Sequence, residues 1–203
     1  MGEVFIVNAA QSNDWLRRWQ RVNGTLEKLL PAPRQNALPA TIDPEVSAYS
    51  FDRAIICDSD EIAQFLIANN VHFENNCAIL SISGYPQSIF DTVIEMLRRN
   101  ADLKVYALHN ASPGGVGLVH QLRTNPKWFA NQAVTIFDLG ISPRQILETC
   151  DLFVQKSEVM AEIARELPDT VRQGLTAEEL AWLDAGYFVE LESFTPQRLL
   201  RVV

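Results

Sequence analysis

Apolar runs of strand length alternate with amphipathic helical stretches through the middle of this chain. The runs span residues 51–57, 77–83, 103–109 and 133–140. Between the second and third runs, apolar side chains recur at the spacing of one helix face, at Phe90, Val93, Ile94 and Leu97. Runs that are apolar on both faces belong inside a parallel sheet, because helices cover both of its sides. The pattern therefore predicts an α/β fold with a mainly parallel central sheet flanked by helices.

The pattern changes twice along the chain, which indicates three segments of one main domain. Residues 1–50 contain a predicted strand, a helix and a proline-rich loop, which we expect to pack on the main domain. Residues 51–141 hold the alternating strands and helices of the core. Residues 142–203 predict a mostly helical C-terminal extension of the same domain.

Residue types typical of helix starts place several of the expected helices. Thr176 and Glu179 have the spacing of a capping box, and Pro86 suits the first turn of the helix that carries Phe90. Asp58 follows the first apolar run, where it either caps the next helix or has a functional role. Both interpretations of Asp58 stay open at this point.

The composition of the chain limits the kinds of molecule that we expect it to bind. The 203 residues are 47% hydrophobic and carry a net charge of -8, which is typical of a globular chain. Direct binding of duplex DNA is doubtful, since that binding depends on lysines and arginines that neutralise phosphates. The N-terminal apolar run is too short for a signal core or a membrane span, so we expect a cytoplasmic protein without a membrane contact.

Two glycine-containing turns follow strands of the core, where open α/β sheets place their ligand sites. Gly84 and Tyr85 lie in the first turn, and Gly114 and Gly115 lie in the second, so these four are candidate cofactor-contacting residues. The backbone amides of the turn at residues 110–115 are suited to a phosphate or a nucleotide. Alternatively, its glycines permit close packing of a helix on the sheet.

Four stretches in the same order resemble the Toprim domain, in the version found in type IIB topoisomerases (topoisomerase VI) and in the related meiotic recombination proteins. The family's acidic strand end corresponds to AIICDSDEI, and its glycine turn to SISGYPQS. Its third strand, which ends in an acidic DxD pair, corresponds to ALHNASPGG, and a later strand and turn to FDLGISPRQI. The resemblance covers about half of the chain and implies a Toprim-like sheet.

The resemblance also implies where a catalytic Mg²⁺ site would lie. Asp58 matches the family's catalytic acid, and Asp60 a second acid, so these two are the candidate metal ligands. The DxD pair is replaced by Asn110 and Ser112, so these family positions are expected to be inactive. Each lost carboxylate removes an attraction of about 4 kcal/mol per charge pair at ~4 Å. We therefore expect no cofactor, or Mg²⁺ binding that is weak at most, with Asp60 or Asp138 as displaced ligands.

These observations favour a non-catalytic or weakly metal-binding protein that serves as a binding or assembly module in DNA processing. A divergent Mg²⁺-dependent phosphoryl-transfer or nuclease-like enzyme that uses Asp58 is the first alternative. A phosphate or nucleotide binder at Asn110–Gly115 is the second. Because the chain is acidic, we expect a protein partner that itself handles nucleic acid, with a homo-oligomer as a further option.

Overall fold

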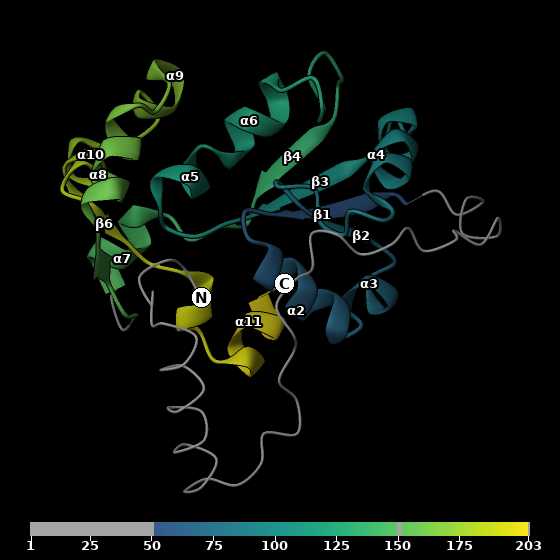
Figure 1. Cartoon of the computed structure of the whole chain (residues 1–203), viewed down its shortest axis with the longest axis horizontal. Coiled ribbons are helices and arrows are strands. Elements are labelled where there is room, and N and C mark those ends of the chain that lie inside the picture. The colour runs from purple at the N-terminus through teal and green to yellow at the C-terminus, as the bar shows by residue number, and fades with distance from the viewer. Residues whose placement is uncertain (1–50, 150–151, 203) are drawn as a thin grey trace, which may run out of the picture. The chain divides into compact units, whose positions relative to one another are not determined.

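A parallel four-stranded sheet with the order β2-β1-β3-β4 forms the centre of the described chain (Figure 1). The computed structural model describes residues 51–149 and 152–202, which belong to one compact unit, Arg34–Val203. The four strands are β1 (Arg53–Cys57), β2 (Ala78–Ser81), β3 (Lys104–Leu108) and β4 (Thr135–Asp138). The predicted α/β fold with a parallel sheet is confirmed. The expected strand, helix and proline-rich loop of residues 1–50 lie outside the described residues.

Helices cover both faces of the sheet, as the doubly apolar strands require. In the core these helices are α2 (Asp60–Ala68), α3 (Val71–Glu74), α4 (Phe90–Arg99), α5 (Pro113–Val116) and α6 (Leu118–Thr124). Alternate residues of β1 enter different hydrophobic clusters: Ala54 and Ile56 pack on one face, and Ile55 and Cys57 on the other. The sheet therefore separates two cores.

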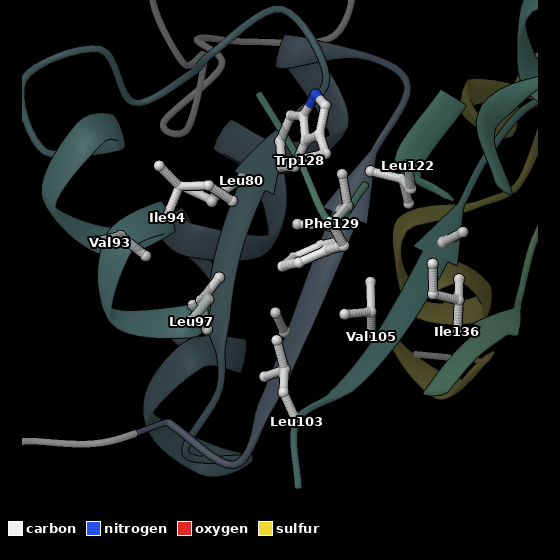
Figure 2. Packing of buried hydrophobic residues seen from close by; sticks show 14 of the residues in the cluster. Leu80, Val93, Ile94, Leu97, Leu103, Val105, Leu122, Trp128, Phe129 and Ile136 are labelled. Carbon is white, nitrogen blue, oxygen red and sulfur yellow. The ribbon is translucent and has the colours of Figure 1, made fainter. Parts of the chain in front are cut away.

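The first core lies between the sheet and the helices α4 and α6 (Figure 2). The stripe predicted for α4 is confirmed, since Val93, Ile94 and Leu97 are buried there and Phe90 packs against them. Trp128 and Phe129, which follow α6, are buried in the same cluster. This packing anchors α4 and thereby places the turn that precedes it.

The structure decides between the two interpretations of Asp58 and corrects one predicted helix start. The residue that caps α2 is Ser59, whose Oγ accepts the Ile62 amide at 3.1 Å, so Asp58 is not the cap. The helix α4 begins at Phe90, so Pro86 lies in the preceding turn and outside the first helical turn. The sequence pattern does not distinguish Ser59 from Asp58 as a cap, and the N-cap of α4 is Ile89, three residues after Pro86. Asp58 is thereby left for other contacts.

The C-terminal segment is mostly helical, as predicted. It contains α7 (Pro143–Thr149), α8 (Glu158–Arg165), α9 (Asp169–Arg172), α10 (Ala177–Asp184), the 3-10 helix η3 (Leu191–Ser193) and α11 (Pro196–Val202). The short strands β5 (Gln155–Lys156) and β6 (Tyr187–Phe188) pair in antiparallel fashion. The capping box of Thr176 and Glu179 is present at the start of α10. Among the described residues, no helix has the length and apolarity needed to cross a bilayer.

Candidate functional site

The carboxyl ends of β1 and β3 meet at the point where the chain changes direction across the sheet. From β1 the chain passes to β2 on one side, and β3 then pairs with β1 on the other side. Such a switch point is where open parallel sheets form ligand sites, because the following loops diverge there. Asp58 and Asn110 each follow one of these two strands.

Asp58 and Asn110 are joined by a hydrogen bond. The Asn110 amide donates to Asp58 Oδ2 at 2.8 Å, and the Asp58 amide donates to the Leu108 carbonyl at 3.1 Å. Burial raises the pKa of the Asp58 carboxyl to about 6, although the Asn110 amide and His109 act in the opposite direction. The second oxygen of Asp58, Oδ1, is buried and has no hydrogen-bond partner. The site therefore contains a carboxylate that is only half satisfied.

The residues that replace the expected DxD pair make internal structural contacts. Asn110 Oδ1 accepts the Leu191 amide at 2.7 Å, and Ala111 exchanges two backbone hydrogen bonds of 2.9 Å with Val189. Ser112 caps α5 by accepting the Gly115 amide at 3.1 Å. This turn thus ties the C-terminal segment to the sheet.

Asp60, the second candidate metal ligand, is directed elsewhere. Its Oδ1 accepts hydrogen bonds from the hydroxyls of Ser81 and Ser83, at the end of β2. Asp58, by contrast, bonds to the turn after β3. Asp58 and Asp60 are close in sequence, but their carboxylates bind at different strand ends. Asp58 accepts from the turn after β3, and Asp60 accepts from the end of β2.

The glycine-containing turns are separate features. Gly84 has a φ of +99°, a left-handed conformation that favours glycine, and borders a pocket of about 630 Å³ beside α4. Tyr85 packs against the hydrophobic cluster on the face of the sheet that carries Ile55 and Cys57. Gly115 lies so close to the preceding turn that a Cβ there would be 2.0 Å from the Asn110 carbonyl oxygen. At Gly115 the close approach is to the turn that precedes α5, whereas the sequence offered packing of a helix on the sheet as the alternative to ligand binding.

The buried His109 and the exposed Asp138 form a hydrogen-bonded pair at the ends of β3 and β4. His109 Nε2 is 2.9 Å from Asp138 Oδ1, and Nδ1 is 2.8 Å from the Asn110 carbonyl oxygen. Both partners are acceptors, so the imidazole donates from both nitrogens when it is protonated. Burial alone lowers the pKa of His109, but the hydrogen bond to Asp138 helps to raise it above its ordinary value. The hydrogen bonds of His109 therefore favour its protonated form.

The sequence analysis considered Asp138 as a displaced metal ligand. In the structure its carboxylate instead forms the hydrogen bond with His109. The hydrogen bond from His109 lowers the pKa of the Asp138 carboxyl, and the Gly140 amide donates to the same oxygen at 3.0 Å. The pairing of these two residues was missed from the sequence. A usable signal existed, because both residues lie at the ends of neighbouring predicted strands.

A second pocket, of about 560 Å³, opens beside the His109–Asp138 pair. Its charged lining includes Arg123 of α6, Arg144 of α7 and Glu179 of α10. Sequence reasoning missed this group as well, and no spacing signal connects its members. They come from helices that only the tertiary structure brings together.

No protein-family model matches this chain, and no curated protein matches it. A function for the chain therefore has to be argued from the geometry of the site and from the sequence resemblance.

Proposed function

We propose that the chain is a Toprim-like binding or assembly module whose strand-end turn has a structural task. The hydrogen bond from the Leu191 amide to Asn110 Oδ1 is the observation that carries this proposal. The Asn110 side-chain oxygen is therefore used in a contact within the protein, which holds the C-terminal segment. Asn110, at the position where the resemblance places the first acid of the DxD pair, thus has a structural role.

A protein partner that handles nucleic acid fits this module better than bare duplex DNA does. The net charge of -8 opposes the phosphate contacts on which direct DNA binding depends. A homo-oligomer is the alternative form of assembly. Light scattering on the isolated chain distinguishes a self-associating protein from one that needs a different partner.

A divergent Mg²⁺-dependent phosphoryl-transfer enzyme is the second candidate, and one observation favours it. Asp58 Oδ1 is buried without a hydrogen-bond partner, and a divalent cation bound there would satisfy it. The nearby Glu192 carboxylate raises the pKa of Asp58 further, beyond the effect of burial, and a cation would relieve that repulsion as well. Carboxylates around a cation of this kind are the ligand set that Mg²⁺ prefers.

The third candidate, a phosphate or nucleotide at Asn110–Gly115, has less support. The amides of Asn110, Ala111 and Gly115 donate to acceptors within the protein. Pro113 has no amide hydrogen to offer. Few donors of this turn remain for an anion.

Replacing Asp58 by asparagine separates the first two candidates. For the module, we expect the stability of Asp58→Asn relative to the native chain to rise by about 2–3 kcal/mol between pH 4 and pH 8, because only the native side chain carries a buried charge with a raised pKa. The net gain at pH 8 is smaller than this, because the amide nitrogen takes the place of Oδ1, which has no hydrogen-bond partner. This gain should shrink as the pH falls from 6 to 4, since the native carboxyl becomes protonated there. Millimolar Mg²⁺ or Mn²⁺ should leave the melting temperature of the native chain unchanged.

The control is Asp102→Asn, which removes an exposed carboxylate outside the site. A metal-dependent rise in Tm that occurs in the native chain and in Asp102→Asn, but not in Asp58→Asn, would overturn the module proposal. That outcome would support the Mg²⁺-dependent enzyme, because a ligand bound only by the folded state raises Tm.

A further inference from the structure

Two arginines line the pocket beside the His109–Asp138 pair, although the protein as a whole is acidic. Its acidic lining residues are Asp138 and Glu179, and each already has a hydrogen-bonded partner. Asp138 pairs with His109 at 2.9 Å, and Glu179 pairs with Arg144 at 3.3 Å. Arg123 remains, and within residues 51–149 and 152–202 it makes no ion pair or hydrogen bond. The pocket therefore offers one uncompensated guanidinium.

The second arginine of the pocket is held in place by the protein. Glu179 is 3% exposed, and its two carboxylate oxygens accept from the backbone amide and from Nη2 of Arg144. A guanidinium has five N–H donors, so this arrangement orients Arg144 and leaves further donors for a ligand. A positioned arginine binds an anion at a lower entropic cost than a mobile one.

Neutral polar groups stand beside the two arginines. His120 and Thr170 line the pocket from α6 and α9, and His120 Nδ1 is 3.2 Å from Thr170 Oγ1. Ser142 contributes a further hydroxyl from the turn before α7. Hydroxyl and imidazole groups next to arginines are typical donors to phosphate oxygens.

The rest of the wall is apolar. It is formed by Val116, Val119, Val171 and Leu175. An inorganic ion would leave this surface exposed to water, whereas an organic group would cover it. A volume of about 560 Å³ is within the range of pockets that hold small organic ligands.

We propose that this pocket binds a small phosphorylated organic molecule, with its phosphate between Arg123 and Arg144 and its organic part on the valine and leucine wall. Residues 110–115 do not line the pocket, so the site differs from the turn at Asn110–Gly115. The inference goes beyond the proposed function. It requires no metal and holds whether the chain is a module or an enzyme.

Calorimetric and thermal-unfolding titrations with AMP and inorganic phosphate test this site. EDTA is present, so that a metal site does not contribute, and the ionic strength is constant, because salt screens these contacts. Both probes should raise the Tm of the native chain. Tighter binding of AMP is the expected result, because its organic part covers the apolar wall. Equal binding of AMP and inorganic phosphate would overturn the organic part of the proposal and indicate free phosphate as the ligand.

Arg123→Gln should weaken the binding of either probe about ten-fold or more, because it removes a charge-assisted contact. Arg99→Gln is the matched control: it changes the net charge equally, but Arg99 lies on α4, 80% exposed and outside the pocket. Thr170→Glu, at an exposed position of the pocket rim, should abolish binding by repulsion. The proposal fails if neither probe binds the native chain, or if Arg123→Gln and Arg99→Gln bind them equally.

Discussion

Gly115→Ala is expected to lower the melting temperature by about 10 °C, which makes it one of the most damaging single substitutions in the chain. A Cβ at this position would lie 2.0 Å from the Asn110 carbonyl oxygen and 3.0 Å from His109 Nδ1. The nearer atom belongs to the backbone, so the turn itself must move. Overpacking of this kind and the loss of a buried hydrogen bond together cost about 3–4 kcal/mol. For a chain of this size each kcal/mol corresponds to about 2–4 °C.

The neighbouring glycine supplies the control for this experiment. A Cβ at Gly114 would meet nothing within 4 Å, and its φ is not in the left-handed region. Gly114→Ala should therefore change stability by less than about 1 kcal/mol, and a small gain is expected from the stiffer unfolded chain. Comparable destabilisation of both variants in thermal and urea unfolding would show that close packing at Gly115 is not the cause.

His109→Gln is expected to cost about 2–4 kcal/mol at pH 6 and to remove a pH dependence of stability. The imidazole is 2% exposed and bonded at both nitrogens, so its loss leaves packing defects and an unpaired carbonyl. A Cβ on Gly140 would be only 2.2 Å from the ring, which shows how closely the ring is covered. A shorter amide side chain fills this space poorly.

The sign of the pH effect follows from the direction of the pKa shift. Because the folded state raises the pKa of His109, its stabilisation is complete below the unfolded value of about 6.5. It is lost as the pH rises from there through the raised pKa. The native protein should therefore become less stable between about pH 6.5 and the raised value, and His109→Gln should show a flatter profile. Urea unfolding across this range measures both.

Asp138→Asn provides the reciprocal variant. It removes the carboxylate that helps to raise the pKa of His109, so the imidazole should titrate at a lower pH in NMR spectra. Asp138 is 60% exposed, so its own loss should cost less than the loss of the buried ring. A native stability profile that is flat above pH 6.5, or an unchanged slope in His109→Gln, would contradict the buried imidazolium.

The fold was readable from the sequence because its signals are local. Strands that are apolar on both faces and a stripe such as Phe90 to Leu97 depend on neighbouring residues, and both appear in the structure where they were expected. The capping box at Thr176 is equally local and is present. The helix that follows Asp58 was also located correctly, but whether Asp58 caps it was left open. Asp58 and Ser59 are both residue types that cap helices, and Ser59 is the one with the backbone conformation of an N-cap.

The site was only partly readable, because its contacts join distant residues. Asn110 was singled out from its place after a strand, yet its bond to Leu191 spans 81 residues. The pairs of His109 with Asp138 and of Arg144 with Glu179 span 29 and 35 residues. Contacts of this kind depend on the strand order and on how the C-terminal helices fold back.

By itself the sequence determined the alternation of strands and helices, the parallel sheet with two buried faces, and the place of the polar strand ends. Those properties arise from the periodicity of apolar residues, which acts over a few residues at a time. The tertiary structure decided that Asn110 holds the C-terminal segment, that the buried His109 is bonded to Asp138, and that Arg123 and Arg144 share a pocket. These outcomes depend on which helices meet at the sheet edge, and that is set by the packing of the whole core.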